Sequence, residues 1–101
     1  MDLAAKHEPG KVIVYMKGEL DHHAAKGAMD YIESTIDLHL PMQLIVDLSG
    51  LSFMDSSGIG VLMAAYRAMR AIGGKVLVQS APAQAMKVLR ATPLDAFMKI
   101  L

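Results

Sequence analysis

The 101-residue chain contains no cysteine, and this absence removes two classes of site. Disulfide bonds and cysteine-based zinc sites are excluded, which agrees with a reducing compartment. The chain also lacks a run of basic residues, and its ten lysines and arginines are balanced by ten acidic residues. A protein that binds nucleic acid usually carries a basic patch, so we expect no nucleic-acid partner.

Long apolar runs are missing as well. The longest such run, residues 59–66, contains a glycine and is far shorter than the roughly 20 residues of a membrane-spanning helix. Residues 1–7 lack the apolar centre of a secretory signal peptide. We therefore expect a soluble, cytoplasmic domain that does not bind a membrane.

The composition that remains is typical of a folded domain. Hydrophobic residues make up 53% of the chain and charged residues 20%, which distinguishes it from a disordered protein. A chain of this length buries roughly 65% of its unfolded surface and forms one core. Residues 1–101 are therefore predicted to form a single domain.

The N-terminal part of the chain changes from a strand pattern to a helix pattern. Residues 3–7 and 11–17 have the pattern of two strands joined by the turn Glu8-Pro9-Gly10, which predicts an antiparallel hairpin at one edge of a sheet. From His22 onward, apolar residues recur at intervals of three and four, as in an amphipathic helix. Asp21 is its predicted N-cap, and Pro41 stops it after residues 39–40.

The next segments predict a parallel crossover. Residues 43–48 form a continuous apolar strand, and a loop over residues 49–57 leads into a helix over residues 57–72. Gly73 and Gly74 end this helix, and residues 75–79 form the next strand. A strand, a helix and a strand in this order predict a right-handed parallel connection.

A third helix is predicted after Pro82, with Ala85, Met86 and Leu89 on its buried face. Thr92 is the expected cap of a short turn of helix, and residues 97–101 form a last strand or a packed tail. The predicted fold is therefore α/β, with a mixed, mainly parallel sheet of four to five strands and helices packed against it.

Binding sites in such sheets gather at the carboxyl ends of the strands. The loop over residues 49–57 follows one strand, and the turn over residues 18–22 follows another. We therefore expect these two segments to lie side by side.

The sequence Asp55-Ser56-Ser57-Gly58 opens the second helix and permits more than one role. Asp and Ser are common N-caps, so a purely structural role is one interpretation. The free N–H groups and dipole of a helix N-terminus also favour a phosphate, and a serine there can in principle attack a substrate. Gly58 and Gly60 each weaken the helix by about 1 kcal/mol, which suggests close approach of another protein to the backbone. Phe53 and Met54 would add an apolar surface beside the hydroxyls if either is exposed.

The polar residues around Asp21, His22 and His23 invite a metal site, but their spacing argues against one. Adjacent residues at a helix start point in different directions, and no pair four residues apart completes a ligand set. A catalytic triad is equally unsupported, because Ser56 and Ser57 lack the glycine-flanked turn of a serine hydrolase. No phosphate-binding loop for a nucleotide occurs. We expect no metal, no cofactor and no enzyme activity.

Three segments of the chain resemble a known family. They are Gly18-Glu19-Leu20-Asp21-His22-His23, Leu51-Ser52-Phe53-Met54-Asp55-Ser56-Ser57-Gly58-Ile59-Gly60 and Ile72-Gly73-Gly74. Together they resemble the anti-anti-sigma factors of the STAS domain family, in the same order over nearly the whole chain. The second segment is specific to this family. The doubled histidine of the first is typical of the sporulation branch rather than the stress-response branch.

The resemblance implies a small cytoplasmic switch protein. In the family, the unphosphorylated form binds an anti-sigma factor that is also a serine kinase, and the sigma factor is released. The kinase inactivates the antagonist by phosphorylating the first serine of the Asp-Ser-Ser-Gly turn, and a serine phosphatase reverses this step. By position, the phosphoacceptor is Ser56, and the partner-binding residues are Asp21, Asp55, Ser56, Ser57 and Gly58.

Two other functions stay open at this point. One is a phosphorylatable STAS scaffold in a stress-response or other signalling pathway. The other is a small hydrolase that uses Ser56 or Ser57, although the nucleophile turn of such enzymes is missing.

Overall fold

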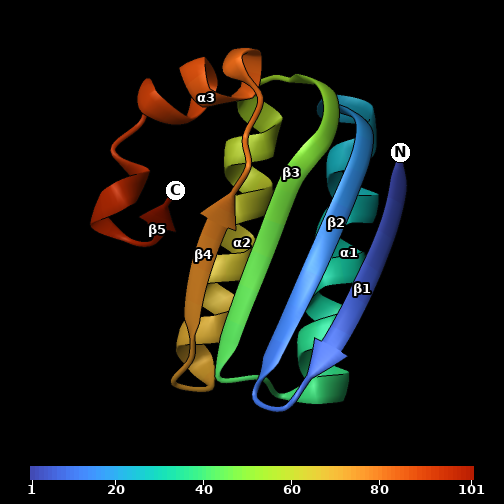
Figure 1. The fold of residues 1–101 in the computed structure, drawn as a ribbon, viewed down its shortest axis with the longest axis vertical. Helices are drawn as coiled ribbons and strands as arrows, with labels where there is room; N and C mark the ends of the chain where they lie inside the picture. Colours follow the sequence, from blue (N-terminus) through green and yellow to red (C-terminus); the bar gives the residue numbers. More distant parts are fainter.

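A five-stranded mixed sheet forms one layer of the molecule, as the computed structural model of residues 1–101 shows (Figure 1). Its strand order is β1-β2-β3-β4-β5, with β1 antiparallel to β2 and every other neighbouring pair parallel. In chain order the elements are β1 (Asp2–Glu8), β2 (Lys11–Leu20), α1 (His22–His39), β3 (Gln43–Met54), α2 (Ser56–Ala71), β4 (Lys75–Gln79), α3 (Ala83–Arg90), the 3₁₀ turn η1 (Leu94–Ala96) and β5 (Lys99–Ile100). The predicted fold class is confirmed, and the sheet has the higher of the two expected strand numbers.

The predicted hairpin lies at the edge of the sheet. Glu8 pairs with Lys11 across a two-residue turn, and Gly10 has a φ of +73°, which a side chain would disfavour. The alternation of β2 is also as expected, because Val12, Val14 and Met16 are buried. The hairpin therefore anchors one side of the sheet and directs β2 toward the carboxyl edge.

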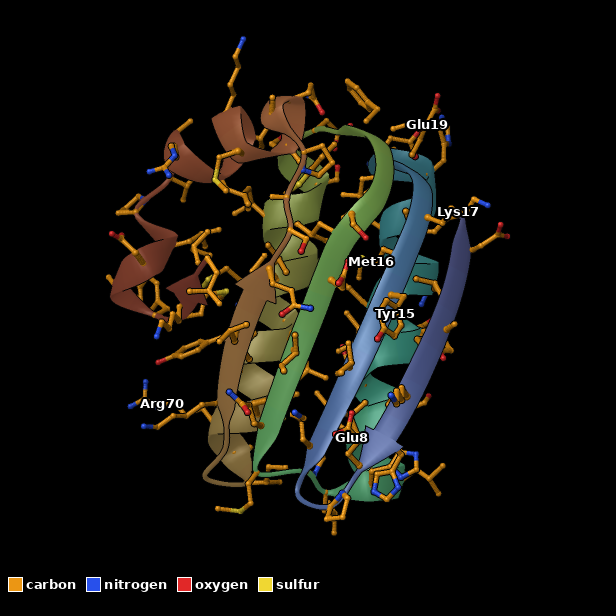
Figure 2. The ribbon with its side chains drawn as sticks, viewed as in Figure 1. Glu8, Tyr15, Met16, Lys17, Glu19 and Arg70 are labelled. Carbon is orange, nitrogen blue, oxygen red and sulfur yellow. The ribbon has the colours of Figure 1, made fainter.

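Helices α1 and α2 pack against the same face of the sheet, while Tyr15 lies on the face that no helix covers (Figures 1 and 2). Val12, Leu44 and Val76 from three neighbouring strands meet this helical layer in one core. Apolar residues at intervals of three and four on α1, such as Ala28 and Ile32, complete that core. Burial of these side chains drives the sheet and both helices together.

Strands β2 and β3 are longer than the sequence suggested. The predicted loop over residues 49–57 is strand as far as Met54, and β2 continues past Gly18 to Leu20. Each extension supplies the pairing partner of the other, since Gly18 lies opposite Leu51 and Leu20 opposite Met54. The register shifts twice along this stretch, which breaks the regular alternation of side chains. The sequence pattern therefore does not indicate a strand there.

The helix boundaries follow the expected stop signals. Helix α1 ends at His39, and Leu40 takes a left-handed conformation with a φ of +45° before Pro41. After α2, Gly73 has a φ of +76° and returns the chain toward β4. No helix in the structure has the length and apolar character that crossing a membrane requires.

Two predictions for the C-terminal region need correction. Thr92 does not cap η1, because Pro93 occupies the cap position and no side chain hydrogen-bonds the turn. On α3, Ala85 and Leu89 are buried as expected, but Met86 is only half-buried because α3 lies at the end of the sheet (Figure 1). The last strand is present as β5, two residues long and parallel to β4.

Candidate functional site

The starts of α1 and α2 lie side by side at the carboxyl edge of the sheet. Leu20 and Met54, the last residues of β2 and β3, are paired, and the Asp55 N–H donates to the Leu20 carbonyl oxygen at 3.3 Å. Helix α1 follows directly after Asp21, and α2 after Asp55. Figure 2 places Glu19 at this same upper end of the sheet, whereas Glu8 lies at the opposite end. The structure thus brings the two predicted segments together, as expected.

Each helix start is capped by an aspartate with nearly the same backbone conformation. Asp21 has φ −110° and ψ −173°, and Asp55 has φ −110° and ψ −172°. The Asp21 carboxylate accepts from the Ala24 N–H at 3.0 Å, and the Asp55 carboxylate accepts from the Ser57 N–H at 2.8 Å. The prediction that Asp21 is an N-cap is confirmed, and the same role is found for Asp55.

Ser56 is the first residue of α2 and is exposed. Its hydroxyl takes no part in the one side-chain hydrogen bond of the turn, which the Asp55 carboxylate accepts. Ser57 is half-buried, and its N–H is already bonded to Asp55. Of the two adjacent serines, Ser56 therefore has the more exposed side chain, at a helix end that favours negative charge.

Gly58 lies inside the molecule, so the expected reason for this glycine is wrong. A Cβ atom at this position would lie 2.6 Å from Met54 Cε, 2.8 Å from Met54 Cγ and 3.1 Å from Leu20 Cδ2. The neighbours that need the glycine are therefore internal side chains rather than an approaching partner. Gly60 has more room, because a Cβ atom added there would have Met29 Cε as its nearest neighbour, at 3.6 Å.

The two apolar residues before the turn have separate roles. Met54 is completely buried between the strand end and α2, whereas Phe53 keeps 40% of its surface exposed. The expected apolar surface beside the hydroxyls therefore consists of Phe53 and not Met54. Its register opposite Glu19 on β2 places it at the same edge as the two caps.

A hydrogen-bonding residue that the sequence did not reveal lies on α3. The Gln84 side-chain oxygen accepts from the Met54 N–H, and the Gln84 side-chain nitrogen donates to the Met54 carbonyl oxygen, both at 2.8 Å. The two residues are thirty positions apart. Local pattern gives no signal for such a contact, because an exposed-looking glutamine in a short helix is ordinary.

Asp47 lies on β3, seven residues before Met54, and its pKa is shifted by its surroundings. Burial by itself raises the pKa of Asp47, but the hydrogen bonds that it accepts outweigh this effect and lower the pKa below its usual value. Ser49 donates through its hydroxyl at 2.6 Å and its N–H at 2.9 Å, and the Gln79 amide donates at 2.9 Å. The bond from Gln79 ties β3 to β4, and those from Ser49 lie within β3, so Asp47 has a structural role.

The surface around the turn offers no enclosed substrate pocket. A hollow of about 700 Å³ is lined by Tyr66, Arg70 and Phe97 among others, and by no residue of the turn. Arg70 lies toward the opposite end of α2 from the carboxyl edge of the sheet (Figure 2). No group of three or more His, Asp or Glu side chains gathers at metal-binding distances, and His22 and His23 meet edge to face with 5.8 Å between ring centres.

Comparison with known proteins points to one family. Residues 2–101 match the STAS domain family. An anti-sigma F factor antagonist from Lysinibacillus sphaericus is 33% identical over 87 residues, which cover 86% of this chain and 74% of that protein. One from Paenibacillus polymyxa is 32% identical over 78 residues, which cover 77% of this chain and 67% of the relative.

Solved structures agree with this assignment. The anti-sigma factor antagonist SpoIIAA in its unphosphorylated form is 27% identical, with a TM-score of 0.84 over 99% of this chain and 88% of that one. The phosphorylated form of the Bacillus cell fate determinant SpoIIAA is also 27% identical, with a TM-score of 0.74 over 99% and 91% of the two chains. With its mixed sheet, its three helices and this match over nearly every residue, the chain belongs to the STAS domain family.

Proposed function

We propose that this protein is an anti-sigma factor antagonist, switched off by phosphorylation on Ser56. Its unphosphorylated form binds an anti-sigma factor that is also a serine kinase, and this binding releases a sporulation sigma factor. A serine phosphatase returns the phosphorylated chain to its active form. The proposal rests on relatives that carry the name of antagonist, and on one structural observation, the exposed hydroxyl of Ser56 at the start of α2.

The position of Ser56 suits a modification that leaves the fold intact. A phosphoserine adds nearly two negative charges at neutral pH. At the first position of α2, these charges meet the positive end of the helix dipole and backbone N–H groups. No buried neighbour has to move, because the Ser56 side chain is exposed. We expect the phosphorylated domain to keep its structure.

Loss of binding then follows from the surface rather than from a change of shape. The proposed partner surface consists of Asp21, Asp55, Ser56 and Ser57, with Gly58 beneath it as a packing residue. If the partner places an acidic group about 5 Å from the phosphate, repulsion costs on the order of 3 kcal/mol at an effective dielectric near 20. This corresponds to about a hundredfold loss of affinity. The bulk of the phosphate acts in the same direction.

The test is phosphorylation by a serine-kinase anti-sigma factor from the same organism, with ATP and mass mapping of the product. We expect one phosphoryl group on Ser56, none on Ser56→Ala, and normal labelling of the control Ser34→Ala, an exposed serine on α1 outside the proposed partner surface. Labelling of Ser56→Ala at the wild-type rate would contradict the assignment of the site.

A second measurement separates the sporulation pathway from the alternative, a phosphorylatable STAS scaffold in a stress-response or other signalling pathway. The unphosphorylated chain is added to a complex of the anti-sigma factor with each sigma factor of the organism. Release of the sporulation sigma factor supports the proposal. Release of only a stress-response sigma factor, or of none, favours the alternative.

A further inference from the structure

Strand β3 loses its neighbour on one side before it reaches Asp55. Its pairing with β4 ends at Asp47 opposite Gln79, while its pairing with β2 continues to Met54 opposite Leu20. The last part of β3 therefore has a strand on one side only. Yet Met54 is completely buried, and a buried backbone N–H and C=O require partners.

The side chain of Gln84 fills this gap. A primary amide presents one acceptor and one donor in a plane, as a peptide group of a neighbouring strand does. Gln84 uses both on a single residue, with the Met54 N–H and carbonyl oxygen each 2.8 Å away. The first turn of α3 thus substitutes for the strand that β4 no longer provides.

Met54 transmits this contact to the phosphoacceptor turn. Its N–H and carbonyl are fixed by Gln84, its side chain packs so closely on Gly58 that a Cβ there would clash, and its next residue is the cap Asp55. The position of Ser56 is therefore set from two directions, by Leu20 on β2 and by Gln84 on α3.

We infer that Gln84 is a positioning residue for phosphoryl transfer to Ser56, acting through the backbone of Met54. This inference rests on the proposed function, because it concerns the geometry in which Ser56 is presented to a kinase. Phosphoryl transfer depends strongly on the alignment of the attacking hydroxyl with the phosphate. A turn released from α3 samples more orientations, so the catalysed step slows even though the folded domain persists.

The test compares Gln84→Met with Lys87→Met. Methionine keeps the length and helix propensity of glutamine but lacks both hydrogen-bonding groups. Lys87 is exposed on the same helix, three residues further on, and forms no ion pair. Both variants are assayed with the purified serine-kinase anti-sigma factor and ATP, well below their unfolding temperatures.

We expect Gln84→Met to lower kcat for phosphorylation of Ser56 by about thirtyfold, the equivalent of two ordinary hydrogen bonds, while KM stays within about twofold. Lys87→Met retains the wild-type values. Unchanged kinetics in Gln84→Met would overturn the inference. So would a rise in KM alone, because it would mean that Gln84 contacts the kinase directly.

Hydrogen exchange of the Met54 amide, measured by NMR without any kinase, tests separately whether the two hydrogen bonds with Gln84 hold Met54. We expect exchange about tenfold faster in Gln84→Met than in the wild type and in Lys87→Met. Equal exchange rates would overturn the claim that Gln84 holds the Met54 backbone. A wild-type chain that no kinase phosphorylates, with Met54 protection still lost in Gln84→Met, would overturn the proposed function and the role in phosphorylation but not the hydrogen bonds.

Discussion

The starts of α1 and α2 are nearly the same structure with different chemistry. Both follow a completely buried strand residue, Leu20 or Met54, and both are capped by an aspartate in the same conformation. The first helical residue, however, is His22 in α1 and Ser56 in α2. The shared features build a stable helix start, so they do not by themselves mark a functional site.

The two helix starts also differ in the side chains that fix their position. The α2 start is fixed by Gln84 through Met54 and has Gly58 packed against that methionine. No side chain makes an equivalent contact at the start of α1, whose side-chain hydrogen bond is the cap from Asp21 to Ala24. We conclude that the hydroxyl and the support from α3 distinguish the proposed phosphoacceptor turn from an ordinary capped helix.

The largest expected effect comes from placing one negative charge at each helix start. Ser56→Asp is predicted to weaken binding to the anti-sigma factor by about a hundredfold, through repulsion at the partner surface. His22→Asp places the same charge at the first position of α1. It is predicted to weaken binding less than about tenfold, because this charge is farther from the partner group that opposes a charge at Ser56. Calorimetric titration of both variants provides the comparison. Equal losses would mean that the two helix starts contribute alike.

Glycines in the two helices are predicted to respond to alanine in opposite directions. Gly58→Ala forces a Cβ against Met54 and Leu20, and we expect a net loss of about 1–2 kcal/mol in the free energy of unfolding. Gly27→Ala on α1 meets no atom within 4 Å and is expected to stabilise the protein by about 0.5–1 kcal/mol. Urea denaturation measures both changes. Stabilisation by Gly58→Ala would show that Met54 repacks freely.

The two caps are predicted to be equivalent in stability but different in function. Asp21→Ala and Asp55→Ala each remove one cap hydrogen bond, so each lowers the free energy of unfolding by about 1 kcal/mol. Only Asp55→Ala is expected to lower kcat for phosphorylation of Ser56, since it loosens the turn that carries the serine, whereas Asp21→Ala, on the proposed partner surface, is expected to raise KM alone. Thermal unfolding and kinase assays of the pair measure these effects. A slow reaction in Asp21→Ala alone would reverse the comparison.

The smallest effect is expected from Asp47, an aspartate that lies on the sheet and not at a helix start. Its hydrogen bonds from Ser49 and Gln79 lower its pKa in the folded state despite partial desolvation. The ionised form therefore stabilises the fold above the unfolded-state pKa of about 3.9, and this contribution is lost as the pH falls through the lower folded-state pKa. Asp47→Asn should remove that part of the acid dependence. Urea denaturation of both proteins from pH 2 to pH 7 measures this change. The same acid dependence of the free energy of unfolding in Asp47→Asn and in the wild type would contradict the prediction.

Much of the fold follows from local signals in the sequence. The turn at Pro9-Gly10, the stops at Pro41 and Gly73, and the change from period two to period near four each act over a few residues. Local physics determines them, so they can be predicted without knowledge of distant neighbours. The extension of β3 to Met54 was missed because its pairing with β2 shifts register twice, and only the partner strand reveals it.

In the candidate site, too, some features could be predicted from the local sequence and others could not. The sequence predicted the cap at Asp21 and the neighbouring positions of the two turns, while its assignment of Ser56 as phosphoacceptor stays a prediction from family resemblance. It suggested the wrong reason for Gly58, because the space around this glycine depends on the side chains of Met54 and Leu20 at the ends of β3 and β2. It contained no sign of the role of Gln84.

The sequence by itself determined the order of strands and helices, the capped start of α1 and the presence of two serines at the start of α2. These features depend on backbone conformations and hydrogen bonds within a few residues of each other. The tertiary structure decided which serine is exposed, which apolar residue beside it is buried, and that α3 holds the turn from thirty residues away. The physical reason is that exposure and long-range hydrogen bonds exist only after the sheet and helices have packed.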